Sequence, residues 1–161
     1  MTLRRLVLPL ALLVALLAGL VALPAPLGPT TADAAPPTAG QSTYVALEPV
    51  RLLDTRTGGV RLGPGGTLDL PVVDGVRVPV GATAVVLNVT ATGGTAVTDV
   101  RVFPTPADGG AGPVVNSLSV GRGATAANLV HVGIGTSGSV RLRNAAGAAH
   151  LVVDLSGYYT K

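Results

Sequence analysis

The sequence contains no cysteine and no tryptophan, and aromatic residues make up only 2% of it. The absence of cysteine excludes a disulfide framework, a thiolate metal site and a cysteine nucleophile. Charged residues contribute 12% and hydrophobic residues 48%, which is not the composition of a charge-rich disordered chain. We therefore expect a folded domain that is stabilised mainly by aliphatic burial and that carries no cofactor.

The charge pattern argues against nucleic acid as a partner. The chain has eleven Lys and Arg residues against eight Asp and Glu, and two of the basic residues, Arg4 and Arg5, lie at its N-terminus. The other basic residues are scattered along the chain. Duplex phosphates are bound by dense basic stripes, and single strands also need stacking aromatics. Neither pattern is present in this sequence.

The N-terminal segment has the three-part order of a secretory signal. Met1–Arg5 is basic, Leu6–Leu23 is apolar, and Ala32-Asp33-Ala34 is a small-x-small cleavage motif. We expect residues 1–34 to be a cleaved signal peptide and the protein to be secreted, with the cell wall as a place of attachment. The alternative is a retained anchor, because the apolar run of 18 residues is close to the length that spans a bilayer. The membrane would be contacted only through this segment.

Beyond the signal, residues 35–42 are rich in Pro, Ala, Thr and Gly and predict a flexible lead-in. Residues 43–161 are then one domain. Twenty glycines and nine prolines cut the chain after residue 34 into short segments rich in Val and Thr. These lengths suit strands better than helices.

Period-two alternation predicts an all-β fold. In Val85–Ala91 the odd positions are all apolar, while Asn88 and Thr90 face the other way. Similar patterns predict about nine antiparallel strands in a β-sandwich of jelly-roll or Ig-like type. The strands are expected at 43–47, 50–53, 67–72, 85–91, 98–102, 114–120, 128–134, 139–143 and 150–156.

An internal echo supports a different fold. Gly81-Ala82-Thr83-Ala84 recurs as Gly123-Ala124-Thr125-Ala126, each time before a strand rich in Val and Leu. Three such units would predict a β-trefoil, which we keep as the alternative, although no third copy is visible. The echo is also explained by two equivalent loop-to-strand entries, one in each half of a sandwich.

The most specific local motif is Arg51–Gly59, in which an apolar strand ends in Asp54, Arg56, Gly58 and Gly59. An Asp at this position forms an Asx-turn, and Asp54 and Arg56 lie on the same side of an extended chain. We expect a structural turn. The functional alternative makes Arg56 an anion or glycan donor and Asp54 a cation ligand, with Asp69 as a further ligand of a structural Ca²⁺.

An enzyme is not expected. His131, His150 and Asp154 accompany several serines, but no Gly-x-Ser-x-Gly elbow is present, and His150 and Asp154 stand about 13 Å apart on one strand. Glu48 is the single glutamate, so no pair of glutamates is available for glycoside hydrolysis. A hydrolase is therefore ranked last among the functions.

A glycan site without tryptophan would depend on tyrosines and arginines. Tyr44, Phe103, Tyr158 and Tyr159 are the aromatic residues available for stacking, and one ring of the Tyr158-Tyr159 pair is expected to close the core while the other faces out. The candidate ligand-binding residues are Arg56, Arg101, Arg141, Arg143, Tyr158 and Tyr159.

Four motifs occur in order: Arg51–Arg56, Ala84–Thr90, Asn128–Val130 and His150–Tyr159. Together they resemble an exported all-β module of actinobacterial cell-surface and extracellular proteins, over about residues 43–159. The resemblance implies a fold without assigned catalytic residues. Many relatives of that module carry two cysteines, at positions where this chain has Thr105 and Arg141.

These observations predict a secreted, envelope-associated, non-catalytic module with a structural or adhesive role. The alternative is a module that binds carbohydrate or peptidoglycan. The expected partners are a cell-wall glycan or another surface protein.

Overall fold

The computed structural model describes residues 40–161. The predicted signal peptide, and the lead-in as far as residue 39, lie outside the described residues. The first strand begins at Thr43. Residues 40–161 include no helix with the length and apolarity to cross a bilayer.

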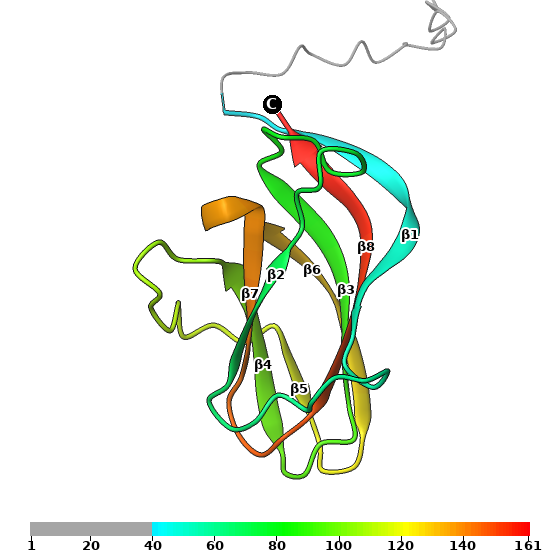
Figure 1. Cartoon of the computed structure of the whole chain (residues 1–161), viewed down its shortest axis with the longest axis vertical. Coiled ribbons are helices and arrows are strands. Elements are labelled where there is room, and N and C mark those ends of the chain that lie inside the picture. The colour runs from blue at the N-terminus through cyan, green and yellow to red at the C-terminus, as the bar shows by residue number, and fades with distance from the viewer. Residues whose placement is uncertain (1–39) are drawn as a thin grey trace, which may run out of the picture. The chain divides into compact units, whose positions relative to one another are not determined.

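The described chain is a sandwich of two antiparallel four-stranded sheets (Figure 1). The first sheet has the order β1-β8-β3-β6 and the second β2-β7-β4-β5. A single turn of 3-10 helix at Thr136–Gly138 precedes β7. The strands are β1 (Thr43–Asp54), β2 (Thr67–Pro71), β3 (Ala84–Thr92), β4 (Thr98–Pro104), β5 (Leu118–Val120), β6 (Thr125–Gly133), β7 (Ser139–Asn144) and β8 (His150–Thr160).

The predicted sandwich is confirmed, but the strand count is eight rather than nine. The two strands expected on either side of Pro49 are one strand, β1, with a register shift between Ala46 and Val50. Proline is tolerated here because β1 lies at the edge of its sheet, where its missing N–H breaks no ladder. The strand expected from Val114 is only Leu118–Val120, and Val114 lies exposed in the preceding loop.

The β-trefoil alternative is wrong, because the strands form two four-stranded sheets instead of three repeated units. The two echoed segments do lead into strands, β3 and β6. These strands are neighbours in the first sheet, with Ala84 opposite Gly133 and Thr92 opposite Thr125. The echo therefore marks two entries into one sheet, and not one entry in each half of the sandwich.

The core lies between the sheets and is built from the alternate positions that the sequence indicated. In β3, Val85, Leu87, Val89 and Ala91 are fully buried, whereas Asn88 and Thr90 are half-buried. The same alternation buries Leu151, Val153 and Leu155 in β8 and Val140 and Leu142 in β7. Each square ångström of aliphatic surface removed from water contributes about 25 cal/mol to stability.

One buried polar side chain, Asn144, holds two loops at the end of the sandwich. Its amide nitrogen lies 2.9–3.1 Å from four backbone carbonyl oxygens, those of Leu62, Gly63, Ala146 and Gly147. Its amide oxygen accepts a hydrogen bond of 2.7 Å from Thr98, whose hydroxyl in turn accepts one from the backbone N–H of Ala146. Asn144 is 0% exposed, so water does not replace these partners.

Replacing Asn144 by alanine should destabilise the domain strongly. The change leaves buried carbonyls and the Thr98 hydroxyl without partners, at a cost of about 1–3 kcal/mol for each group that stays unsatisfied. Urea denaturation measures the loss in the free energy of unfolding. The matched control is Asn116→Ala in an exposed loop, which should change it by less than about 0.5 kcal/mol. Equal effects of the two substitutions would contradict the role of Asn144.

Candidate functional site

The outer face of the first sheet carries a row of aromatic side chains. Tyr158 and Tyr159 are consecutive in β8, so they point to opposite sides of the sheet. Tyr158 packs against the core, and Tyr159 lies on the outer face next to Tyr44 of β1 and His131 of β6. We call Tyr44, Tyr159 and His131 the aromatic row.

The rings of the aromatic row are in contact and are held by hydrogen bonds. The Tyr44 and Tyr159 ring centroids are 5.4 Å apart, and those of His131 and Tyr159 are 5.8 Å apart. The Tyr159 hydroxyl lies 2.9 Å from Nδ1 of His131, and the Tyr44 hydroxyl donates to the carbonyl oxygen of Ser156 at 3.1 Å. The rings are thus oriented without being covered, since Tyr44 remains 45% exposed.

The backbone beneath the row leaves space for these rings. A Cβ at Gly157 would lie 2.5 Å from the Tyr44 ring, so a larger residue there would displace the ring. The residue opposite Tyr159 in β3 is Ala84, and the residue opposite Ala84 in β6 is Gly133. These small neighbours leave room above β3 for the contact between the Tyr159 ring of β8 and His131 of β6.

The predicted turn residues Asp54 and Arg56 form a charged network at the end of β1, next to β8 in the first sheet. The Asp54 carboxylate accepts hydrogen bonds from the backbone N–H of Arg56 at 3.0 Å and from its guanidinium at 2.9 and 2.7 Å. The first contact is an Asx-turn. Arg51 bridges Asp54 to Asp154, at 3.2 and 2.8 Å. The turn continues through Gly58, which has a positive φ of 91°, and Gly59, whose absent side chain leaves space for Thr55.

The network lowers the affinity of Asp54 for protons. Hydrogen bonds from the Arg56 side chain hold the pKa of the Asp54 carboxyl well below its usual range, and the Arg56 N–H and the charge of Arg51 act in the same direction. Asp54 in turn raises the pKa of Arg56. Asp54 and Arg56 therefore satisfy each other, although the Arg56 side chain remains 50% exposed.

A second carboxylate with a lowered pKa lies in the loop between β2 and β3. Hydrogen bonds from the Arg77 side chain and from the N–H groups of Val76 and Val78 hold the pKa of Asp74 below its usual range. The Arg77 Nε lies 2.7 Å from the Asp74 carboxylate. Asp74 thus organises its loop in the same way as Asp54.

Arg141 and Asp69 lie on the outer face of the second sheet and are bound to each other. Nε and Nη2 of Arg141 donate to the two Asp69 oxygens at 2.6 and 2.8 Å, and this pairing lowers the pKa of Asp69. Nη1 donates to the carbonyl oxygens of Gly109 and Gly110 at 2.8 and 2.9 Å. Arg141 therefore fastens the loop 105–117 to β7.

The same loop removes Phe103 from the surface. Phe103 is 2% exposed, and Gly112 lies against its ring so closely that a Cβ there would overlap it. Phe103 is thus unavailable for stacking on a ligand, whereas Tyr158 is partly buried and packs against the core. Of the tyrosines, Tyr44 and Tyr159 lie on the outer face of the first sheet.

The candidate calcium ligands are not brought together. Asp54 ends β1 in the first sheet and Asp69 lies in β2 of the second sheet, and arginine side chains occupy the oxygens of both. Residues 40–161 contain no group of three or more His, Cys, Asp or Glu side chains arranged to hold a metal ion.

The two histidines are separated, and each contacts a hydroxyl group. His131 contacts Tyr159, as described above, and Nδ1 of His150 lies 3.1 Å from the Thr55 hydroxyl. Thr55 is 5% exposed, and its hydroxyl also accepts the backbone N–H of Leu151. The Thr55–His150 contact therefore links the end of β1 to the start of β8. In the described part of the chain, no carboxylate forms an ion pair with either histidine.

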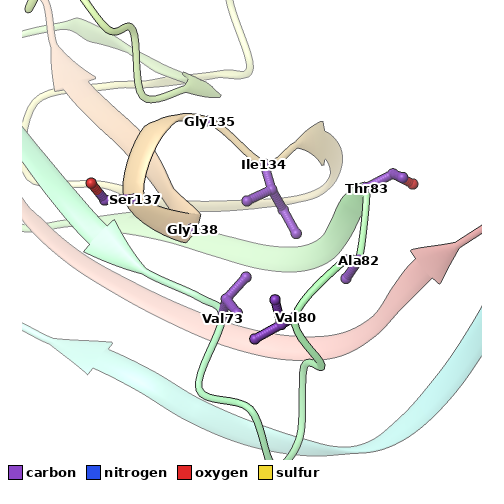
Figure 2. A pocket seen from close by; sticks show the side chains of 9 residues that line it. Val73, Val80, Ala82, Thr83, Ile134, Gly135, Ser137 and Gly138 are labelled. Atoms are coloured by element: carbon purple, nitrogen blue, oxygen red, sulfur yellow. The ribbon is translucent and has the colours of Figure 1, made fainter.

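A pocket of about 560 Å³ opens at one end of the sandwich (Figure 2). The side chains of Val73, Val80 and Ile134 converge there, whereas the hydroxyl groups of Thr83 and Ser137 point away from that centre. The lining contains no titratable side chain and no arginine or tyrosine. The pocket therefore lacks the polar groups that would orient a ligand.

Sequence reasoning missed part of the aromatic row. It identified Tyr159 as a candidate residue and named Tyr44 for stacking, but it assigned no binding role to Tyr44 or His131. The association of these side chains depends on strand register. Tyr44 of β1 lies opposite Tyr159 of β8, and His131 of β6 lies opposite Val86 of β3, the strand between β8 and β6. No local motif carries this information.

Acid should destabilise the fold through Asp54 and Asp74. A carboxyl with a lowered pKa in the folded state stabilises that state fully above its unfolded pKa of about 4, and this contribution is lost as the pH falls below that value. Urea denaturation from neutral pH to about pH 3 should show a fall in stability that Asp54→Asn and Asp74→Asn each reduce. The control is Asp108→Asn, since the Asp108 carboxylate accepts a hydrogen bond from the Gly110 N–H and forms no ion pair with an arginine in the described chain. A fall that is unchanged in both variants would contradict this assignment.

Comparison with known proteins leaves the chain unassigned. No family model matches the sequence, and no curated protein is significantly similar to it. The resemblance to the actinobacterial module therefore stays a prediction, and function has to be inferred from the residues and their contacts.

Proposed function

We propose that this domain is an exported, non-catalytic adhesive module of the cell envelope that binds a neutral polysaccharide along the aromatic row. Export is inferred from the signal predicted in residues 1–34. The proposed partner is a glycan of the cell wall, bound on the surface of the sheet instead of in a cleft.

The observation that carries this proposal is that Tyr44 is 45% exposed although its hydroxyl is anchored to the backbone. An aromatic ring held in one orientation loses little conformational freedom when it binds, and it presents an apolar face bordered by polar groups. A pyranose ring also has apolar faces and a polar edge. The rings of the aromatic row and the sugar units of a polysaccharide therefore offer each other the same combination of apolar faces and polar edges.

The polar neighbours suit the same ligand class. Asn88 and Asp154 are opposite one another in β3 and β8, on the outer face that carries the aromatic row. Both are half-buried. The Asn88 amide gives hydrogen-bond partners for sugar hydroxyl groups, whereas both oxygens of Asp154 already accept hydrogen bonds from Arg51. The rings provide the stacking surface.

The order of the strands supports a jelly-roll for this module in preference to an Ig-like fold. The chain passes from one sheet to the other at every connection except the one between β4 and β5. An eight-stranded double sheet is the jelly-roll arrangement, which lectin domains also use, whereas the Ig fold places its first two strands in one sheet.

The absence of catalysis is proposed from the surroundings of the reactive groups. The carboxylates with lowered pKa are engaged by arginines, so they stay ionised and cannot act as proton donors near neutral pH. The hydroxyl beside His150 belongs to the buried Thr55 and accepts a backbone N–H.

Retention on insoluble polysaccharide tests the proposal. The native domain should bind purified cell wall and its neutral polysaccharide fraction, and Tyr44→Ala and Tyr159→Ala should each weaken binding about tenfold, the loss expected for one stacking contact. Leu129→Ala is the matched control, because Leu129 is an exposed apolar side chain on the same face outside the row. Affinity is measured by depletion from solution.

Binding should be the same in EDTA and in Ca²⁺, since the aromatic row contains no metal ligand set. Equal retention of the native protein and both tyrosine variants would overturn the proposal. Retention that requires Ca²⁺ would also overturn it, in favour of a cation-dependent site.

A further inference from the structure

The outer face of the second sheet brings two arginines side by side. Arg101 of β4 and Arg143 of β7 are register partners. Side chains that are directly opposite in antiparallel strands have Cβ atoms about 4.5–5.5 Å apart. The two arginine side chains therefore leave the same face of the sheet from neighbouring positions.

Neither arginine forms an ion pair in the described chain. Arg51, Arg56, Arg77 and Arg141 each pair with an aspartate, whereas no ion pair or hydrogen bond involves the side chains of Arg101 and Arg143. The carboxylates nearest along these strands are already engaged. Asp69 is bound by Arg141, and Asp99 accepts hydrogen bonds from Asn116 and Ser119.

Arg101 and Arg143 are also less exposed than most of the arginines that form ion pairs. Arg101 and Arg143 are half-buried, while Arg51, Arg56 and Arg77 are exposed. Arg143 lies along the loop between β1 and β2, where a Cβ at Gly65 would be 3.7 Å from its Nη2. Partial burial of two like charges without compensation is unfavourable, and like charges directly opposite one another in a sheet are destabilising.

We propose that Arg101 and Arg143 form a binding site for an oxyanion, a phosphate or carboxylate group carried on a polymer. The guanidinium fork matches both groups through paired N–H···O bonds, and one anion between two arginines removes their repulsion. The Thr67 hydroxyl stands beside Arg143 in the same row of the sheet and offers a further donor.

This site is independent of the proposed polysaccharide function, because it lies on the opposite sheet and uses different chemistry. Arg141 is not part of this site. Its side chain donates hydrogen bonds to Asp69 and to loop carbonyls, whereas the donors of Arg101 and Arg143 remain available.

Thermal unfolding in phosphate tests the inference. Sodium phosphate should raise the melting temperature of the native domain, and the rise should saturate, while sodium chloride of equal ionic strength should not reproduce it. Arg101→Gln and Arg143→Gln should each raise the melting temperature without phosphate, because they remove the repulsion, and should abolish the response to phosphate. Arg122→Gln is the matched control, since Arg122 is an exposed arginine without a partner, and it should change neither property.

The source of the anion is resolved by comparing polymers. Binding of a phosphodiester polymer and of a polyuronate is measured by calorimetry, and the preferred one identifies the ligand group. A phosphate response that chloride reproduces, or that persists in Arg101→Gln and Arg143→Gln, would overturn the site. Tyr159→Ala should keep the full phosphate response, so failure of this site and failure of the aromatic row are distinguishable.

Discussion

Aliphatic burial between the two sheets is the interaction on which the structure depends. Alternate residues of each strand, such as Val85, Leu87 and Val89, are committed to this core. The other half of each strand must therefore face outward or lie under a loop. In a domain without cysteine, no covalent link relaxes this requirement. The available surface for function is consequently the two outer sheet faces and the loops that join the strands.

Aspartate–arginine pairs organise the loops around this core. Asp54, Asp69 and Asp74 each bind an arginine, and in each case the pair fastens a turn or loop to its neighbouring backbone. Arg141 is the most connected of these arginines. Hydrogen bonds from its side chain attach the loop 105–117 to β7. Half of the charged side chains in residues 40–161 are thus used in ion pairs within the domain.

The two outer faces differ in chemistry as a result. The first sheet presents the aromatic row, whose rings are oriented by hydrogen bonds from their own polar atoms. The second sheet presents Arg101 and Arg143, which the internal pairing leaves out. An adhesive module with a stacking surface on one sheet and a cationic surface on the other would contact two kinds of polymer at once. Binding at two sites raises overall avidity without requiring high affinity at either.

The sequence by itself determined the all-β class, the positions of most strands and the residues that face the core, because β alternation and glycine or proline breaks act over a few neighbouring residues. It also indicated the Asx-turn at Asp54, in which the partners are two residues apart. It could not show that β1 continues through Pro49, since this depends on the strand lying at a sheet edge.

Only the tertiary structure decided which distant side chains meet. Tyr44, His131 and Tyr159 come together through the register of strands from both ends of the domain. The pairing of Arg101 with Arg143, and the capture of Arg141 by Asp69, likewise follow from strand order. Local pattern specifies which face of a strand a residue occupies, but its neighbours across the sheet are set by long-range pairing, which no short segment encodes.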